Sequence, residues 1–302
     1  PSPRFSQQIT VMRLQGTLPL LTASIGLASM GLAPPCWAAG PWLSETGGVD
    51  MGMAGAGRAA MAMDATSLAA NPAAMAGLSG TAVTAAAMPL ALDYEFHGSD
   101  ASPAAAHNQE DVSVVPALFA VHRADRLTYG IGVYSYLGLS FDSGNSWQGR
   151  RVIEQAGIAT LNIAPGIAWR ATDRLALGVA VAAQLVEPTA RMAVANDAAF
   201  YGPPVGLPDG QLELDGQSWA AGGQLGMTYA LTEGSTIGLS WTAPVDHTVA
   251  FDISAKGLHP VLATLMPPDD AARLDVTLPQ QLLLGVAHQV DADTMLAFGL
   301  SW

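Results

Sequence analysis

Residues 127–141 read LTYGIGVYSYLGLSF, and this stretch decides what kind of fold the chain can adopt. Its odd positions carry Leu, Tyr, Ile, Val, Ser, Leu, Leu and Phe, whereas its even positions carry three glycines, two tyrosines, Thr and Ser. Because successive side chains of a β-strand point to opposite faces, one face of this strand is apolar and the other is small or polar. The stretch is also long enough for the ~9–11 residues with which a tilted strand crosses a bilayer.

The same two-residue alternation recurs along most of the chain and predicts nine antiparallel strands. We expect them at residues 81–96, 111–123, 127–141, 158–170, 175–186, 218–231, 237–253, 274–290 and 294–302. The connections alternate in length: those at 124–125, 171–173, 232–234 and 291–293 are short, and those at 97–110, 142–150, 195–216 and 254–272 are long. Short periplasmic turns and long outer loops are typical of a transmembrane antiparallel β-barrel. The predicted fold class is therefore all-β.

A soluble β-sandwich is the alternative that this pattern leaves open. Its strands average about 5–6 residues, which is shorter than the strands expected here. The polar face also leaves space, because it carries many glycines together with Gln224, Thr228 and Ser240. Aromatic residues near strand ends on the apolar face fit either the interfacial girdles of a membrane barrel or the core of a sandwich. They are Trp169, Trp219, Tyr229, Trp241 and Trp302.

The composition excludes several classes of protein. Of 302 residues, 50% are hydrophobic and 12% are charged, which is too apolar for a disordered chain. The 32 glycines and 20 prolines disfavour a helical fold, because both residues destabilise helix interiors. The net charge of −13 leaves no basic stripe for a phosphate backbone, so we expect no nucleic-acid partner. No residue spacing predicts a metal site or a cofactor.

The first 39 residues have the three parts of an export signal. Arg4 and Arg13 precede an apolar run at 18–33, and the small residues Ala38 and Ala39 follow it. A single transmembrane helix is the alternative, although two glycines interrupt the run. Cleavage after these alanines would also remove Cys36, the only cysteine of the chain, so we expect no disulfide.

The segment before the first strand breaks the alternation. Residues 47–78 are rich in Gly and Ala, contain five methionines and end in a turn at Asn71-Pro72. No Gly-Lys-Ser/Thr follows the glycines, so a phosphate-binding loop is excluded. A compact piece without strands ahead of a barrel can plug its lumen. We therefore expect a signal peptide at 1–39, a plug at 40–80 and the barrel wall at 81–302.

This segment contains Gly55, Gly57 and Arg58, then Asp64, then Asn71, Pro72 and Ala73. The motifs that these residues form resemble the N-terminal hatch of the FadL/TodX family, the outer-membrane transporters of long-chain fatty acids and aromatic hydrocarbons. The Leu278-Pro279-Gln280 stretch similarly resembles a strand motif of that family, and the resemblance extends over residues 47–302.

The resemblance implies the architecture and the role of the protein. The family fold is a barrel of 14 strands with an N-terminal plug in the lumen, so about five strands are expected beyond Trp302 and the chain looks C-terminally truncated. The implied function is passive uptake of hydrophobic small molecules, either long-chain fatty acids or aromatic hydrocarbons. The implied location is the outer membrane of a Gram-negative bacterium, where the protein contacts lipid and is expected as a monomer.

The resemblance also assigns residues to an uptake route. Two outer loops would form a capture groove, and a kink in the third strand, at Ser135, Tyr136 and Gly138, would open a lateral exit. The loops do carry apolar residues where loops are normally polar, although these residues could simply pack on one another. The groove residues are Phe200, Tyr201, Val205 and Leu207 in one loop and Leu258, Val261, Leu262, Leu265 and Met266 in the other.

The cation that would hold a fatty-acid carboxylate has no clear counterpart. The fifth strand reads Ala183-Gln184-Leu185 where an arginine is expected, which favours a neutral hydrocarbon. Arg191 and Lys256 are possible substitutes, or else solvated charges at the rim of the barrel.

Two other functions remain as alternatives. A lipase-like enzyme needs a serine and a histidine within hydrogen-bond reach, but His122, His247 and His288 are isolated in the sequence. No Gly-x-Ser-x-Gly motif occurs, and Asp269-Asp270 fits solvated loop charge better than a calcium site. We therefore expect no catalytic activity. A purely structural barrel is the second alternative.

Overall fold

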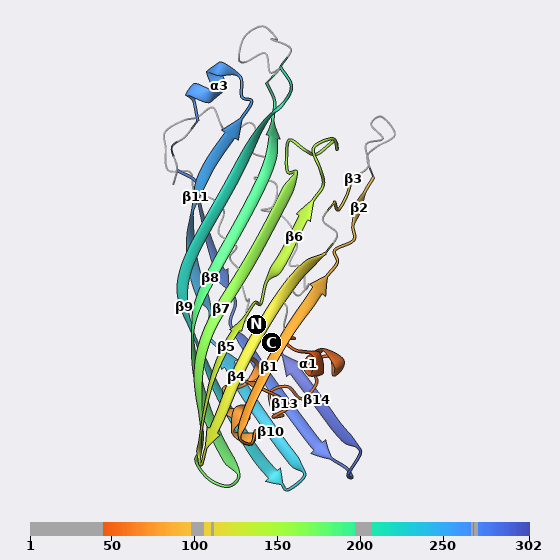
Figure 1. Ribbon diagram of the computed structural model, residues 1–302, viewed down its shortest axis with the longest axis vertical. Helices are drawn as coiled ribbons and strands as arrows, with labels where there is room; N and C mark the ends of the chain where they lie inside the picture. Colours follow the sequence, from red (N-terminus) through yellow and green to blue (C-terminus); the bar gives the residue numbers. More distant parts are fainter. Residues whose placement is uncertain (1–44, 98–105, 110–111, 197–206, 267, 269–270) are drawn as a thin grey trace, which may run out of the picture.

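The computed structural model describes residues 45–97, 106–109, 112–196, 207–266, 268 and 271–302. One curved antiparallel sheet forms a wall, with long connections and helix α3 (Pro260–Thr264) at its upper end and tight turns at its lower end (Figure 1). None of the helices in this part of the chain has the length and apolar character that a membrane span requires. The N-terminal segment, with α1 (Gly48–Gly52), α2 (Ser67–Ala70) and the 3-10 helix η3 (Pro72–Gly77), lies against the inner face of the wall.

Twelve strands make up the sheet, and a separate hairpin pairs β2 (Glu95–Phe96) with β3 (Ala106–His107). The order along the sheet is β1-β4-β5-β7-β8-β9-β10-β13-β14, with β1 and β14 at its edges. The strands are β1 (Thr81–Leu90), β4 (Ser113–Ala124), β5 (Leu127–Tyr134), β6 (Gly138–Asp142), β7 (Gln155–Arg170), β8 (Leu175–Val194), β9 (Gly210–Thr232), β10 (Ser235–Thr242), β11 (Val245–Lys256), β12 (Arg273–Leu278), β13 (Gln281–Gln289) and β14 (Met295–Ser301).

Three crossings of the wall are interrupted, so the twelve strands make nine crossings, as the alternation predicts. β5 and β6 both pair with β7, and β10 and β11 both pair with β9. The breaks before β11 and β13 lie side by side, because Thr242 pairs with Gln281 and Val245 with Leu278. Pro244 and Pro279 occupy these two breaks, where a residue without a backbone N–H removes a ladder bond.

The longest strands run past the ends that the sequence predicts. β8 continues to Val194 instead of ending at residue 186, and β9 begins at Gly210 instead of residue 218. These predicted ends were wrong because the outward residues become polar there, with Glu187 and Thr189 on β8 and Asp215 and Gln217 on β9. A strand with polar residues on its outer face loses the alternation of hydrophobicity, although its backbone pairing continues.

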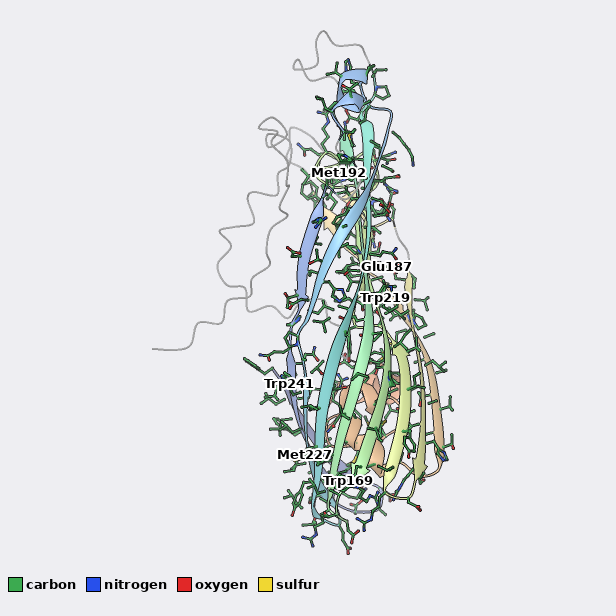
Figure 2. All side chains as sticks on the ribbon, turned by 90° about the vertical axis from the view of Figure 1, so that its left-hand side faces the viewer. Trp169, Glu187, Met192, Trp219, Met227 and Trp241 are labelled. Carbon is green, nitrogen blue, oxygen red and sulfur yellow. The ribbon has the colours of Figure 1, made fainter. Side chains whose placement is uncertain are left out.

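The outer face of the wall carries an apolar belt. Leu177, Val179 and Val181 of β8 are exposed there, and Leu225 of β9 lies directly beside Val179. Figure 2 shows Trp169 at the lower end of this belt and Trp219 at its upper end, just below Glu187. These tryptophans are 50% and 55% exposed, which suits rings that sit at the two interfaces of a membrane.

Glycines on the inner face let the plug lie directly on the wall. A Cβ at Gly178 would collide with the backbone of Ala73, one at Gly226 with the Asn71 side chain, and one at Gly238 with the carbonyl of Ala59. Buried side chains fill the remaining space, and they include Leu68 and Met75 of the plug and Phe119 of β4. The inner face therefore accommodates a second layer of chain rather than a second sheet.

Candidate functional site

Asn71 fastens the plug to the wall. Its fully buried side chain donates from Nδ2 to the carbonyl of Ala59 at 2.6 Å and to that of Met227 on β9 at 3.1 Å. Its Oδ1 accepts a hydrogen bond from the N–H of Ala73 at 3.0 Å, which caps η3, and Pro72 occupies the first position of that helix. One amide therefore connects two parts of the plug with the barrel wall.

The other hatch-motif residues shape the plug backbone. Asp64 accepts hydrogen bonds from the backbone N–H and the hydroxyl of Thr66 ahead of α2. Gly55 and Gly57 have φ of 71° and 70°, a left-handed conformation that side chains disfavour. Gly57 also lies against Ala297 of β14, where a Cβ would be too close.

Arg58 is a buried cation in the lumen. Its guanidinium lies 3.4 Å from the carboxylate of Asp50, and only 8% of Arg58 and 3% of Asp50 are exposed. Burial raises the pKa of the Asp50 carboxyl, and the Arg58 charge opposes part of that rise.

The wall is broken between β5 and β6, at residues 135–137. The side chain of Thr160 on β7 replaces the missing ladder, because its Oγ1 accepts from the N–H of Leu137 at 2.9 Å and from that of Tyr136 at 3.1 Å. The Ser135 hydroxyl donates to the Leu137 carbonyl at 2.7 Å. The break is therefore an ordered local structure that its own hydrogen bonds stabilise.

Above this break, β6 has a hydrogen-bonded neighbouring strand on one side only. β6 pairs with β7 only, and the segment 113–117 of β4 pairs with β1 only, so no backbone ladder joins β4 to β6 in the described part of the chain. The Val115 side chain lies against Gly138, where a Cβ would be 2.9 Å from its Cγ2. Side-chain contact, and not a hydrogen-bond ladder, closes the wall here.

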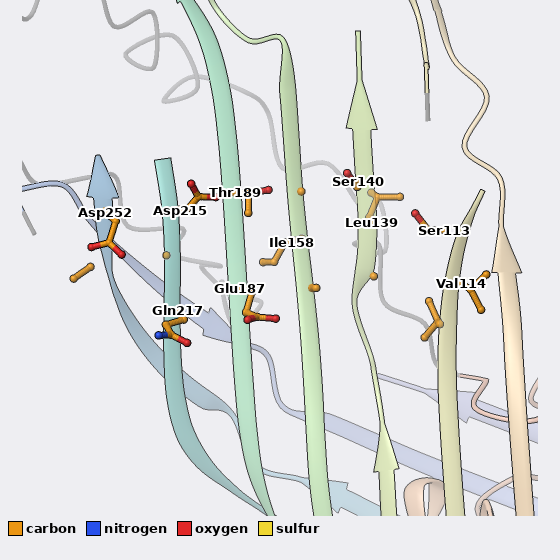
Figure 3. A pocket seen from close by; sticks show the side chains of 16 residues that line it. Ser113, Val114, Leu139, Ser140, Ile158, Glu187, Thr189, Asp215, Gln217 and Asp252 are labelled. Atoms are coloured by element: carbon orange, nitrogen blue, oxygen red, sulfur yellow. The ribbon is translucent and has the colours of Figure 1, made fainter. Parts of the chain in front are cut away.

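A pocket of about 790 Å³ lies on the outer face at this gap. It is lined by Val114, which points outward, and Val115, which points inward. Figure 3 shows Thr189, Asp215 and Asp252 at one level on adjacent strands, and the pairing register continues this row to Gly157 and Ser140.

Inside the lumen, the break adjoins an aromatic cluster. Tyr134 stacks on Phe119 with ring centroids 5.2 Å apart, and it meets Tyr136 edge to face at 5.0 Å. The hydroxyls of Tyr134 and Tyr136 are 3.1 Å apart. The break therefore carries apolar rings with two polar ends.

Apolar side chains continue from the break to the outer end of the lumen. Leu137 of the break packs with Val186, Val245 and Leu278. Higher up, a second cluster joins β9, β11 and the start of β12 and is formed by Leu214, Val249, Phe251 and Ala272. A polar row also crosses the lumen, since Gln184 donates to Asn162 at 2.7 Å and meets Nε2 of His247 at 3.1 Å.

The predicted capture groove is only partly covered by the described residues. Phe200, Tyr201 and Val205 lie outside them. Leu207 and the two α3-region residues Val261 and Leu265 are exposed. Leu258, Leu262 and Met266 are half-buried.

Asn196, which the sequence analysis did not identify, holds these loop ends together. Its Nδ2 donates to the carbonyls of Pro208 at 2.6 Å and Gly257 at 2.7 Å, and its Oδ1 accepts from the N–H of His259 at 2.7 Å. The sequence carried no signal for this role, because an asparagine in a loop is common and the partners lie 12 and 61 residues further along the chain.

The two possible substitute cations are both engaged at the upper rim. Arg191 lies 3.0 Å from Asp142 and 3.5 Å from Glu154, and Lys256 lies 3.0 Å from Glu213. These ion pairs fit the second reading of the sequence, in which both are rim charges.

The residues considered for catalysis do not converge. His122 and His288 hydrogen-bond Thr81 and Ser235, each at 2.8 Å, at exposed strand ends, and His247 is buried in the polar row. The described residues contain no group of three His, Cys, Asp or Glu side chains that could hold a metal ion.

An antiparallel wall with an apolar outer belt, two aromatic borders and a plug on its inner face defines a plugged outer-membrane β-barrel protein. Residues 30–302 match the model of the family described as outer membrane protein transport protein (OMPP1/FadL/TodX). The chain belongs to this family and is a protein of the outer membrane of a Gram-negative bacterium.

Solved structures show the same fold at low sequence identity. The toluene transporter TbuX of Ralstonia pickettii is 20% identical, with a TM-score of 0.62 over 83% of this chain and 69% of that chain. A FadL homologue of Pseudomonas aeruginosa is 16% identical, with a TM-score of 0.63 over 86% and 68% of the two chains. A ΔS2S3 mutant of the monoaromatic hydrocarbon channel TodX is 17% identical, with a TM-score of 0.63 over 86% and 70%. No curated protein sequence matches the chain significantly.

Proposed function

We propose that this protein is a passive channel through which long-chain fatty acids or aromatic hydrocarbons enter the cell, and that they leave the barrel sideways into the membrane. Membership of a family of outer-membrane transport proteins supports transport of hydrophobic small molecules. The arrangement of the lumen and the wall supports the route. Lipid around the belt and a hydrophobic solute are the partners, and a monomer suffices for this route.

Capture begins at the outer loops in this proposal. Val261 and Leu265 expose apolar surface around α3, where water would otherwise favour polar residues. The second loop, with Phe200, Tyr201 and Val205, would complete the groove together with Leu207. A solute bound there leaves water and reaches the mouth of the lumen.

Two apolar clusters would line the path inward, and the polar row of Asn162, Gln184 and His247 crosses the lumen between them. Phe251 and Leu214 line its upper part, and Leu278 and Leu137 its lower part. The plug occupies the lumen below these clusters, so the path ends at the break in the wall.

The observation that carries the proposal is the gap between β4 and β6 at the upper border of the belt. Thr160, which supports the break, is in register with Val186 and Ser218, one residue from the outward Trp219. The Val115 side chain closes the gap by its contact with Gly138, and such a contact opens at far lower cost than a hydrogen-bonded ladder. Ser135, Tyr136 and Gly138 would form the exit, which meets the outer leaflet.

A disulfide across the gap, which can be formed by oxidation and removed by reduction, tests this route. The Cβ position of Gly138 is 2.9 Å from Val115 Cγ2, so cysteines at both positions come within the Cβ separation of about 3.5–4.5 Å that a disulfide requires. We expect the double variant Val115→Cys/Gly138→Cys to take up toluene or oleate slowly when oxidised and at the wild-type rate when reduced. Uptake is measured in vesicles that contain the full-length protein.

The matched control places a disulfide between two strands that are already joined by backbone hydrogen bonds. Ala120 of β4 lies opposite Ile131 of β5 on the outer face, so Ala120→Cys/Ile131→Cys should leave uptake unchanged in both redox states. Equal uptake by the oxidised and reduced gap variant would exclude the lateral exit. No uptake by the wild-type protein would exclude transport itself and favour a structural barrel.

A further inference from the structure

The row of buried polar side chains that crosses the lumen ends in an atom without a hydrogen bond. The row consists of Asn162 on β7, Gln184 on β8 and His247 on β11, and none of them is more than 3% exposed. Within the residues that the structure describes, Nδ1 of His247 makes no hydrogen bond. A buried polar atom without a partner is destabilising, so this atom indicates a polar group that is bound beside it.

The hydrogen bonds of the row assign the proton of the imidazole ring. Nδ2 of Asn162 donates to the carbonyl of Tyr134 at 3.3 Å, so Oδ1 faces Gln184 and accepts from its Nε2 at 2.7 Å. Gln184 therefore presents Oε1 to His247, whose Nε2 lies 3.1 Å away and must carry the proton. Burial favours the neutral ring, in which Nδ1 then has a lone pair. The atom without a partner is an acceptor.

The neighbours of the ring do not supply the donor that this lone pair needs. The backbone of Ser218 on β9 faces the ring, but its carbonyl is an acceptor as well. Asp246 points outward, where it accepts from the hydroxyl of Thr277 at 2.6 Å. Val245 and Val249, the inward residues on either side of His247 along β11, are apolar. The donor must therefore belong to a molecule in the lumen.

The row lies between the outer mouth of the lumen and the break in the wall. Gln184 is in register with Ala220 of β9, and Gln224, further down on β9, bonds to the plug at the carbonyl of Ala69. At the other end of the row, Tyr134 is the last residue of β5 before the break. A solute that has passed the upper apolar cluster would therefore meet the row before it reaches the break.

The lone pair on Nδ1 selects the chemistry of that solute. A hydroxyl group can donate to it, while the apolar body of the same molecule packs on Leu137 and Val186. A hydrocarbon would leave Nδ1 without a partner. A carboxylate has no proton to donate and would place its charge against the lone pair.

We propose that His247 accepts a hydrogen bond from the hydroxyl of an apolar solute, such as an alkylphenol, and that this bond favours hydroxyl-bearing solutes over hydrocarbons and carboxylates. Asn162 and Gln184 are positioning residues, because their amides hold the proton of the ring on Nε2 and leave Nδ1 open to the solute. The proposal rests on the proposed function and narrows its substrate class to neutral molecules with a hydrogen-bond donor.

The test compares three ligands that share one aromatic body. Labelled p-cresol has a hydroxyl donor, 4-methylanisole has the same oxygen without the proton, and toluene has neither, and each is titrated onto the full-length protein in lipid nanodiscs. His247→Gln can still donate to Oε1 of Gln184 but lacks the acceptor at Nδ1. We expect it to weaken p-cresol binding roughly fivefold or more and to leave the other two ligands within about twofold. His288→Gln, at an exposed histidine of β13, is the matched control and should change none of them.

Two outcomes would overturn the proposal while the channel function stands. Unchanged p-cresol binding in His247→Gln would show that Nδ1 has only an internal water as its partner. Equal weakening of all three ligands would show that the variant alters the packing of the lumen and not a particular hydrogen bond. If the wild-type protein binds none of the three ligands and no oleate, the proposed function fails as well.

A measurement on the wild-type protein checks the assignment without any variant of uncertain folding. In nitrogen-15 spectra of protein labelled at its histidines, His247 should show a protonated Nε2 and a bare Nδ1, and p-cresol should shift mainly the Nδ1 resonance. Toluene should leave both resonances in place. A proton on Nδ1 in the free protein, or an unmoved Nδ1 resonance at saturating p-cresol, would overturn the proposal.

Discussion

Thr160 and Leu137 form two hydrogen bonds that replace regular strand pairing. The Thr160 hydroxyl accepts the N–H of Leu137 at 2.9 Å, and the Leu137 carbonyl accepts the N–H of Thr160 at 2.8 Å. This relationship satisfies the N–H groups of Tyr136 and Leu137 and the carbonyl of Leu137 at the membrane border, where β5 ends and β6 begins. The gap beside β4 is consequently a stable part of the fold.

Replacing Thr160 by Val should destabilise the break. The variant has nearly the same shape but leaves the N–H groups of Tyr136 and Leu137 without their acceptor, at a cost of about 1–3 kcal/mol. Urea unfolding of the reconstituted protein measures the loss. Thr160→Ser keeps the hydroxyl and should stay close to the wild type, and equal stability of Thr160→Val would refute this role.

Replacing Asn71 by Ala should loosen the plug while the wall stays folded. The carbonyls of Ala59 and Met227 would lose a buried donor, which costs about 1–3 kcal/mol. We expect protease to cut the plug faster and uptake of a hydrophobic substrate to fall, also when Pro72→Ala is combined with it. Asn71→Asp, which keeps the acceptor for Ala73 but loses the donor, should behave like Ala. Unchanged proteolysis would contradict the role of this amide.

Adding a methyl group to the inner wall should displace the plug. Gly238→Ala would collide with the carbonyl of Ala59, whereas a Cβ at Gly223 on β9 meets no atom within 4 Å. Planar-bilayer recordings should therefore show a larger conductance for Gly238→Ala and the wild-type value for Gly223→Ala. The same conductance in both variants would show that the plug is not held against this glycine.

The upper rim should respond to acid through Asp209. Hydrogen bonds from Arg151 and Arg150 lower the pKa of this carboxyl below its ordinary value of 3.8. A lowered pKa means that the interaction stabilises the fold above the unfolded value and is lost as the pH falls through the folded value. Asp209→Asn should thus destabilise the outer loops at pH 7 by no more than about 1 kcal/mol, because the pair is partly exposed, and proteolysis of these loops should be faster. The effect should be smaller at a pH well below 3.8. An equal effect at both pH values would contradict this assignment.

Much of the wall was predictable because its cause is local. Any strand that faces lipid needs an apolar residue at every second position, whatever its neighbours are, so the strands at 175–186 and 218–231 could be recognised without knowing their partners. The prediction failed above Glu187 and Asp215, where the outer residues are polar and the alternation stops although pairing continues to Val194.

The contacts of the plug with the wall could not be predicted from the sequence. The motif residues Asn71 and Arg58 were recognised by resemblance, but nothing in the sequence indicated that Asn71 would bond to Met227 or that Arg58 would pair with Asp50. Asn196 was missed altogether, because its partners Pro208 and Gly257 are brought to it only by the pairing of long strands.

The sequence by itself determined that this chain forms strands, which face of each strand meets lipid, and that nine crossings follow one another. Only the tertiary structure decided the register between strands, the missing ladder between β4 and β6, and the meeting of Arg58 with Asp50. The physical reason is that alternation fixes the direction of a side chain but not its height or its neighbour. Those depend on hydrogen bonds between segments far apart in the chain.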